Sequence, residues 1–298
     1  MLENNYKITV FTATYNRSYT LFRLYESLIN QSSKNFEWLI VDDGSADDTK
    51  ELIESFILDQ KIDIKYYRQQ NGGKHRAINK GVQLARGELF YIVDSDDFLV
   101  TDSLEMILDI YNGIKDDNDF AGVCGLKVYP NMTPLGGEPD FEVIDANAID
   151  IRYKYHIKED LAEVFKTEIL KDFAFPDIEG EKFCPESLLW NRIAEKYKLR
   201  YTNKKIYICE YLEDGLSKAS VKIRIKSPNY ATTFYQELFY LNIPIKYRIK
   251  AGINYWRFAL YTNQSLFKLL ENIGWISLPL LPIGQIFKMI DGKIVNKY

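Results

Sequence analysis

The chain has 298 residues, a net charge of −4 and 46% apolar side chains, so it can bury one large core or two smaller ones. Its three cysteines are scattered without Cys-x-x-Cys spacing, which excludes a recognisable zinc signature or disulfide framework and favours a reducing cytosol. The first residues do not begin a signal peptide and no apolar run of about 18 residues occurs, so we expect a cytoplasmic protein without a transmembrane helix.

The first 130 residues alternate between strand-like and helix-like patterns. Strands are expected at 7–12, 36–41, 62–68, 88–94 and 120–129. Helices are expected between them, at about 18–30, 47–58, 74–85 and 103–114. This alternation predicts an α/β fold in which a mostly parallel, Rossmann-like sheet carries helices on both faces.

The pattern changes after residue 130. Prolines and glycines predict a long loop over 130–157, and such loops often have a binding role. We then expect helices at about 158–171 and 186–197, a strand at 205–211, and a helical segment from about residue 227.

The loop after the first expected strand reads Thr-Ala-Thr-Tyr-Asn-Arg over residues 12–17. It contains no glycine, which argues against the dinucleotide-binding GxGxxG motif and against a P-loop. Its hydroxyls, aromatic ring and guanidinium suit a nucleoside and its phosphates, although a capped turn before the next helix would use the same residue types.

The second expected strand ends in two aspartates. Gly44 suits a tight turn, and Ser45 with Asp48 suits a helix N-cap. Asp42 fits a turn residue whose carboxylate is satisfied locally. Asp43 has no such structural explanation from the sequence, and its carboxylate could accept a hydrogen bond from the N–H edge of a base such as uracil.

The loop after the third expected strand places Gly72 and Gly73 before Lys74. Glycines let the backbone approach a phosphate, and Lys74 or Arg76 could neutralise it, whereas a flexible turn with solvated basic residues is the alternative. His75 suits a base, a ligand or a hydrogen-bonded structural residue.

The fourth expected strand runs directly into Asp94-Ser95-Asp96-Asp97. Open α/β folds bind ligands at this carboxyl edge of the sheet. In an extended chain Asp94 and Asp96 would lie on one face, about 6.6 Å apart, where they could share a hard cation and the oxygens of a phosphate. Asp102 can start the next helix, so the four residues are not needed to cap it.

In this order and spacing, the four motifs resemble family 2 glycosyltransferases of the GT-A fold, of the type that builds bacterial surface polysaccharides. The resemblance is close over residues 6–115 and looser to about 218. It implies a UDP-sugar donor, Mg²⁺ or Mn²⁺ on its diphosphate, and inversion by one direct displacement.

The resemblance also assigns residues. It implies that Asp96 is a direct metal ligand and that Asp94 approaches the ribose or the metal. The residues implied to bind the nucleotide sugar are Thr12, Ala13, Thr14, Tyr15, Arg17, Asp43, Asn71, Lys74, Asp94 and Ser95.

An inverting displacement needs a general base, which the family places in an acidic pair opening a helix, about 90 residues beyond the metal motif. Here Pro185 suits the first helical residue and Glu186 the first turn, but Ser187 replaces the second carboxylate. Glu186 is the implied base, although a first-turn glutamate also complements the helix dipole. Trp190 could stack on an acceptor sugar or pack in the core. Residues 210–217, with a turn at Gly215, resemble a loop that closes the catalytic domain.

The C-terminal part differs in composition. Residues 222–298 carry 11 Lys and Arg against 3 Asp and Glu, a balance of +8, whereas the rest stands at −12. Residues 229–298 contain 14 aromatics, and residues 273–287 carry no charge. We expect a catalytic domain over 1–221 and a helical segment over 222–298 that lies on an anionic membrane face, packs on the sheet or forms a homo-oligomer. No recognised motif supports nucleic-acid binding.

We therefore expect a hexosyl- or N-acetylhexosaminyltransferase that uses a UDP-sugar and a saccharide acceptor, lipid-linked or free, at the inner face of the cell membrane. One alternative is a non-catalytic nucleotide-sugar binding module, because only one carboxylate stands at the position of the base. The other is a sugar-1-phosphate nucleotidyltransferase, whose glycine-rich N-terminal loop is missing from residues 12–17.

Overall fold

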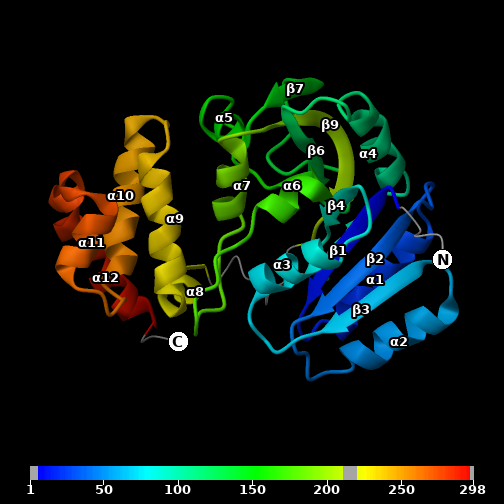
Figure 1. The fold of residues 1–298 in the computed structure, drawn as a ribbon, viewed down its shortest axis with the longest axis horizontal. Coiled ribbons are helices and arrows are strands. Elements are labelled where there is room, and N and C mark those ends of the chain that lie inside the picture. Colours follow the sequence, from blue (N-terminus) through cyan, green and yellow to red (C-terminus); the bar gives the residue numbers. More distant parts are fainter. Residues whose placement is uncertain (1–5, 211–219, 296–298) are drawn as a thin grey trace. The chain divides into compact units, whose positions relative to one another are not determined.

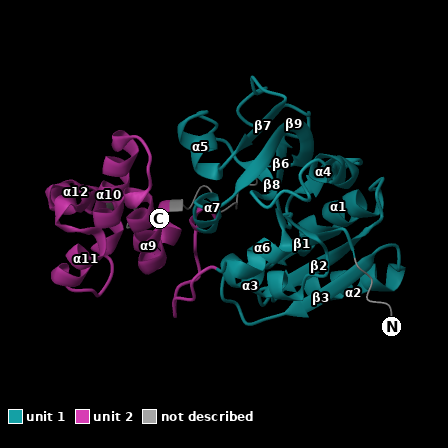
Figure 2. Cartoon of the chain, turned by 45° about the horizontal axis from the view of Figure 1, so that its top comes forward, with its two compact units in different colours: residues 1–174, 189–211 teal, residues 175–188, 212–298 magenta. Residues whose placement is uncertain are grey.

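The computed structural model describes residues 6–210 and 220–295 (Figure 1). The chain divides into two compact units (Figure 2). Unit 1 comprises residues 1–174 and 189–211, and unit 2 comprises residues 175–188 and 212–298. The expected domain boundary after residue 221 stays a prediction, and the segment 175–188 belongs with the C-terminal helices.

In the described residues, unit 1 is built on one nine-stranded sheet with the order β3-β2-β1-β4-β8-β6-β9-β5, in which β7 pairs with β9. Figure 1 labels most of these strands. The strands are β1 (Ile8–Thr14), β2 (Phe36–Asp42), β3 (Asp63–Arg68), β4 (Leu89–Ile92), β5 (Phe98–Leu99), β6 (Phe120–Val128), β7 (Val143–Ala146), β8 (Leu161–Lys166) and β9 (Lys198–Ile208).

The strand order reverses next to β1. Strands β1, β2 and β3 follow one another in parallel towards one edge, and β4 then pairs in parallel with the other side of β1. Strand β8 is antiparallel to both β4 and β6, which makes the sheet mixed. In open α/β sheets, such a switch point leaves a crevice outside the carboxyl ends of the two strands.

Helices cover both faces of this sheet, as the sequence predicts. They are α1 (Ser18–Ile29), α2 (Thr49–Asp59), α3 (Lys74–Leu84), α4 (Ser103–Asn112), α5 (Ala148–Tyr153), α6 (Thr167–Asp172) and α7 (Ser187–Ala194). On one face, Val10 and Trp38 join a core with the apolar residues of α1, α2 and α4. On the other face, Phe11 stacks on Phe90 and lies against Gly81 of α3. The alternation follows from the two-residue period of a strand.

Three expectations about the later elements are wrong. The helix expected at 158–171 is strand β8 followed by the short helix α6. Ala162 and Val164 of β8 are buried in the core between two antiparallel neighbours, and this pairing overrides the local preference. The expected loop at 130–157 contains β7 and α5, and β9 begins at Lys198, seven residues before the expected strand.

Unit 2 is helical, as expected from about residue 227. It contains α8 (Ser220–Lys226), α9 (Pro228–Tyr240), α10 (Ile245–Ala259), α11 (Leu266–Ile273), the 3-10 helix η2 (Trp275–Leu280) and α12 (Leu281–Val295). Its core includes Tyr255, Trp256, Leu269 and Ile273. Among the described helices, none is by itself long and apolar enough to cross a membrane, whereas the pair of α11 with the η2–α12 segment passes that test but bends by 112°.

A buried glutamate ties the segment 175–188 to α9. Glu181 is 6% exposed, and its carboxylate accepts hydrogen bonds from the backbone N–H of Asn229 (2.8 Å) and Tyr230 (2.9 Å) and from the Asn229 side chain (2.7 Å). These N–H groups open a helix and have no partner within it, and a negative charge there also complements the helix dipole. Glu181 therefore anchors the segment that leads to Glu186.

We predict that Glu181→Ala lowers the free energy of unfolding by about 2 kcal/mol, because it leaves buried donors at the start of α9 unsatisfied. Urea titration measures this loss. Glu179→Ala is the matched control, since Glu179 is exposed on the same segment and should change little. Equal stability of the two variants would show that the anchor contributes nothing.

Candidate active site

The loops after β1, β2, β3 and β4 lie at the carboxyl ends of the parallel strands, and β1 and β4 flank the switch point. Backbone and side-chain hydrogen bonds join the first two loops. Asn16 donates its backbone N–H to Ser45 and accepts from the N–H of Ala46, and Asp47 accepts two hydrogen bonds from Ser18. Asn16 holds a left-handed conformation (φ 52°), which asparagine tolerates well.

Asp42 is the last residue of β2, and Asp43 follows it. The carboxylates of both residues accept hydrogen bonds from other parts of the chain. Asp42 accepts from the Ser45 N–H (2.7 Å) and the Tyr66 hydroxyl (2.8 Å), as its turn interpretation predicts. Asp43 is 4% exposed and accepts from the N–H groups of Gly72 (2.9 Å) and Gly73 (2.7 Å) and from a side-chain amide at 69. The prediction that Asp43 lacks a structural role is therefore wrong.

This contact also changes the expected role of the glycines. The N–H groups of Gly72 and Gly73 bind the Asp43 carboxylate, and this leaves them unavailable to a phosphate. Gly73 has φ 100° and precedes Lys74, the first residue of α3. Asn71 lies against Gly44, where an added Cβ would approach the Asn71 nitrogen to 3.0 Å. The glycines therefore shape the loop that presents Lys74.

Asp94-Ser95-Asp96-Asp97 is a turn, and the expectation of an extended segment is wrong. Strand β4 ends at Ile92, and the N–H of Asp97 donates to the Asp94 carbonyl at 3.2 Å. Ser95, at the centre of the turn, is 7% exposed. The Lys74 amine donates to the Asp94 carboxylate at 2.5 Å, and this salt bridge connects the loop after β3 to the turn after β4.

Tyr207 of β9 holds the turn through two hydrogen bonds. The Tyr207 hydroxyl accepts from the Asp94 N–H (3.0 Å) and donates to the Asp97 carboxylate (2.7 Å). Asp97 also accepts from the N–H of Glu210 (3.2 Å), in agreement with its expected structural role. The Lys127 amine lies 4.3 Å from the centre of the Tyr207 ring, and the two residues are partners in the β6–β9 ladder.

The charges around this turn are strongly coupled. Burial favours the neutral form of Asp94, but the charges of Lys74 and Lys127 hold its pKa below the usual value. Burial and the charge of Asp94 raise the pKa of Asp96 and raise the pKa of Asp97 to about 7. The structure thus keeps Asp94 ionised beside two carboxyls that resist ionisation.

Strand β1 runs to Thr14, so the loop expected over 12–17 begins only at Tyr15. The end of β1 and this loop contribute residues with different surroundings. Thr12 is fully buried and accepts a hydrogen bond from the Trp38 indole (3.0 Å), so its side chain packs in the core and does not line the edge of the sheet. Thr14 Oγ1 is buried with no hydrogen-bond partner among the described residues. Ala13 is partly buried, Tyr15 is 49% exposed, and Arg17 contributes to the charge environment of Asp96.

The other two predicted site residues lie around the start of α7, where the boundary between the units falls. Glu186 belongs to unit 2 and directly precedes α7, which begins at Ser187 and not at Pro185 as expected. Trp190 belongs to unit 1 and stacks on Phe165 with ring centres 4.5 Å apart. This is the packing alternative for Trp190, and its acceptor role stays a prediction.

The sequence interpretation missed three residues of the site. Lys127 and Tyr207 surround the turn, and Arg23 of α1 donates to the Asp96 carbonyl (3.1 Å) and pairs with Glu210. A lysine between Leu126 and Val128 in an apolar strand was a usable signal, because a charge at such a position needs a partner. Of the loop expected at 210–217, residues 211–217, with Gly215, lie outside the described residues.

The donor atoms around the turn suit a divalent cation that is shared with a ligand. Asp94 and Asp96 belong to the same four-residue turn, closed by the Asp97 N–H on the Asp94 carbonyl. Burial and the charge of Asp94 raise the pKa of Asp96, and a bound cation would offset both effects. Among the described residues, no cluster of three or more His, Cys, Asp or Glu could hold a metal. Two carboxylates completed by phosphate oxygens and water are the usual Mg²⁺ arrangement in phosphate-binding sites.

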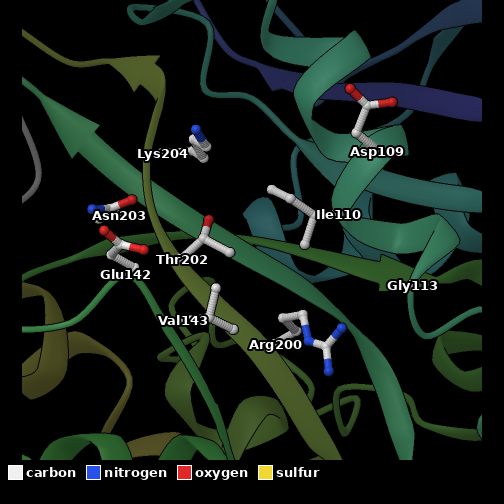
Figure 3. A pocket seen from close by; sticks show the side chains of 9 residues that line it. All are labelled: Asp109, Ile110, Gly113, Glu142, Val143, Arg200, Thr202, Asn203 and Lys204. Carbon is white, nitrogen blue, oxygen red and sulfur yellow. The ribbon is translucent and has the colours of Figure 1, made fainter.

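A separate cavity of about 450 Å³ lies between α4 and the strands β7 and β9 (Figure 3). Arg200 and Lys204 contribute cations to its wall, and Asp109 and Glu142 contribute carboxylates. Its lining residues include none of the predicted site residues. We therefore locate the candidate site at the switch point, where the charged side chains converge, and not in this cavity.

The fold of the chain is similar to that of solved glycosyltransferases. Over 95% of this chain, the structure is similar to TarS of S. aureus solved in complex with UDP-GlcNAc, with a TM-score of 0.64, 17% identity and 88% coverage of that chain. A mannosyltransferase of Pyrobaculum calidifontis, solved with GDP-Man and Mn²⁺, gives a TM-score of 0.58 at 16% identity, with 96% and 87% coverage.

The sequence itself identifies the family. A model of glycosyl transferase family 2 matches residues 9–158, about half of the chain, and the chain belongs to this family. It is 36% identical to glycosyltransferase GlyA of Streptococcus pneumoniae over 225 residues, 74% of this chain and 31% of that protein.

The name of a further relative states the molecule to which that enzyme transfers a sugar. The chain is 28% identical to the GalNAc(5)-diNAcBac-PP-undecaprenol beta-1,3-glucosyltransferase of Campylobacter jejuni over 213 residues, 68% of this chain and 62% of that protein. An uncharacterized glycosyltransferase of Rickettsia conorii is 39% identical over 105 residues, 35% of this chain but 17% of that protein. The chain thus covers less than two thirds of the length of these relatives.

We predict that Tyr207→Phe destabilises the protein by about 1–3 kcal/mol, because it leaves the buried Asp97 carboxylate and the Asp94 N–H without their shared partner. The measurement is urea unfolding. Tyr201→Phe is the matched control on the same strand, since Tyr201 is buried and its hydroxyl makes no hydrogen bond within the described part of the chain. Equal losses in both variants would contradict the role assigned to the Tyr207 hydroxyl.

Proposed function

We propose that this chain is a metal-dependent, inverting glycosyltransferase that moves a sugar from a UDP-sugar to a hydroxyl of a saccharide acceptor. The observation that carries the proposal is the turn at Asp94–Asp97, where two interacting carboxylates stand beside Lys74 at the switch point of the sheet. Membership of glycosyl transferase family 2 supports the reaction type.

The nucleotide would lie over the loops after β1 and β2. The exposed ring of Tyr15 is available to stack on a base, and the buried, unpartnered hydroxyl of Thr14 is a polar group at the same strand end. Asp43 accepts three hydrogen bonds, and a carboxylate has about four acceptor positions, so one remains for the N–H edge of uracil. Asn71 and Ser95 would border this site.

The diphosphate would lie between the β4 turn and the start of α3. Asp96 and Asp94 would hold Mg²⁺ or Mn²⁺, which when bound neutralises charge on the leaving diphosphate. The Lys74 amine, already next to Asp94, and the Arg17 guanidinium would contribute two further positive charges. The ion pair with Lys74 keeps Asp94 ionised before any ligand arrives.

The acceptor hydroxyl needs a base, and we assign this role to Glu186. The assignment is supported by its position immediately before α7, about 90 residues beyond the acidic turn, where the family places its base. Glu186 would take the proton of the hydroxyl as that oxygen attacks the anomeric carbon and the bond to the diphosphate breaks. A single displacement of this kind inverts the anomeric configuration.

The acceptor class is proposed by analogy with the Campylobacter jejuni relative, whose name describes transfer to an undecaprenol-linked saccharide. We propose a lipid-linked saccharide in the biosynthesis of a bacterial surface polysaccharide. Trp190 remains a candidate for contact with this acceptor, although its ring already stacks on Phe165.

The reaction is tested by release of UDP from a panel of UDP-hexoses and UDP-N-acetylhexosamines with Mn²⁺ or Mg²⁺. We expect one donor to be turned over, and we expect Asp96→Asn to reduce the rate by on the order of 10² or more because it removes a metal ligand. Asp96→Asn should also lose the thermal stabilisation that UDP with Mn²⁺ gives to the parent protein.

Asp102→Asn is the control for this experiment, because Asp102 is exposed and its side chain makes no capping hydrogen bond. An unchanged rate in Asp96→Asn would exclude the metal role. Thermal stabilisation by a UDP-sugar without turnover, across a broad set of acceptors, would favour the non-catalytic binding module.

We expect Glu186→Gln to reduce kcat by about 10²–10⁴ while donor affinity is retained, because it removes the base and leaves the nucleotide site unchanged. The measurements are kcat in the UDP-release assay and the Kd of the donor by calorimetry. Ser187→Ala, at the exposed neighbouring position, should keep the parent rate. An undiminished rate in Glu186→Gln would remove the assignment of the base and leave the donor site intact.

A further inference from the structure

Helix α12 exposes an apolar stripe to solvent. Ile283, Ile286, Phe287 and Ile290 are between 40% and 57% exposed. Their spacing of three and four residues places them on one side of the helix. In a helix on the surface of a water-soluble domain, this apolar side normally faces the core.

The side of α12 that packs on the rest of unit 2 carries charged residues as well as Leu281. Asp291 is 1% exposed and accepts two hydrogen bonds from the Arg257 guanidinium of α10, at 2.6 and 2.5 Å. The Lys288 amine donates to the Leu260 carbonyl at 2.5 Å, and Gly284 lies directly against Trp256. The charged side chains of Lys288 and Asp291 thus lie on the packed side of α12, whereas the isoleucines and Phe287 of the stripe are exposed.

The neighbouring η2 segment extends the exposed apolar surface. Trp275 is 63% exposed and Ile276 is 80% exposed, and η2 contacts both α11 and α12. The chain carries no charge from residue 273 to residue 287. We call the side chains of Trp275, Ile276, Ile283, Ile286, Phe287 and Ile290 the apolar surface of unit 2.

Unit 2 also exposes positive charge. On α10, the exposed Ile245 and Ile249 alternate with the exposed Lys246 and Lys250. Two of the three acids of residues 222–298 are neutralised, since Asp291 is buried against Arg257 and Glu271 pairs with Lys268 (2.9 Å). Residues 222–298 thus combine exposed apolar side chains with excess cations.

We propose that unit 2 docks on an anionic lipid bilayer, with the apolar surface inserted at the level of the headgroups. Buried apolar area and cations near anionic lipids both favour such interfacial binding. An identical copy of unit 2 would bring the same positive charges together, whereas anionic lipid attracts them. The 112° bend between α11 and the η2–α12 segment fits a shallow position in the interface.

This inference rests on the geometry of unit 2 and does not require the proposed function. It would place the enzyme on the surface that carries a lipid-linked acceptor, if that acceptor is the correct one. The test therefore measures lipid binding and not sugar transfer.

Cosedimentation of the full chain with phosphatidylcholine vesicles, with and without phosphatidylglycerol, tests the proposal. We expect binding to the anionic vesicles that weakens with salt, and a blue shift of the Trp275 fluorescence that is missing in Trp275→Phe. Ile286→Glu combined with Ile290→Glu should reduce the bound fraction by about tenfold or more, since it adds charge to the inserted stripe.

Leu58→Glu is the matched control, because Leu58 of α2 in unit 1 is 80% exposed and its substitution should leave vesicle binding unchanged. The substituted side chains are exposed, and an unchanged melting temperature verifies that each variant is folded. Failure of the parent protein to bind anionic vesicles, or equal binding by the double variant, would overturn the proposal. A lipid-independent dimer that Ile286→Glu dissociates, together with no vesicle binding, would assign the surface to a second copy instead.

Discussion

The candidate site depends on how the aspartates at the ends of β2 and β4 are paired. A buried carboxylate without partners is costly, and each of these finds partners in a different segment. Asp43 binds the glycine loop after β3, Asp94 binds Lys74, and Asp97 binds Tyr207 of β9. The same contacts hold three loops and a distant strand in one arrangement. Asp96 accepts a hydrogen bond from Arg23 through its backbone carbonyl, and its carboxylate is the metal ligand that we propose.

Some aspartates of the site stabilise its loops, and others are the ones that we propose to bind the ligand. Asp43 accepts hydrogen bonds from the Gln69 side chain and from two glycine N–H groups, and Asp97 accepts from Tyr207 and from the Glu210 N–H. These contacts fix the shape of the site, and Asp43 keeps one acceptor position for a ligand. Asp94 and Asp96 remain near each other, one held ionised by lysines and the other shifted towards its neutral form. If the proposed function is correct, a site preorganised in this way would receive the cation and the diphosphate without a large rearrangement of the protein.

Polar and apolar side chains are distributed differently in unit 2. Its core contains aromatic side chains and a buried Arg257–Asp291 pair, while the outer side of α12 is apolar. Arg257 donates two hydrogen bonds to the Asp291 carboxylate, which compensates the cost of burying these charges. This pairing lets α12 carry charged side chains on its packed side. Composition alone left the role of the C-terminal helices open between membrane, sheet and second copy, and the exposed apolar side chains of α12 are the basis of our proposal for a membrane.

The sequence by itself determined the first four strands, the four helices among them and the order of the motifs, because alternating apolar runs and local turn residues fix these elements within short stretches. It also pointed to the acidic turn and to family 2. Only the tertiary structure decided that residues 161–166 form a strand, that Asp43 is a structural ligand of the glycine loop, and that Lys127 and Tyr207 belong to the site. Each of these depends on a partner about 30 to 110 residues away, and such contacts leave no periodic trace in the local sequence.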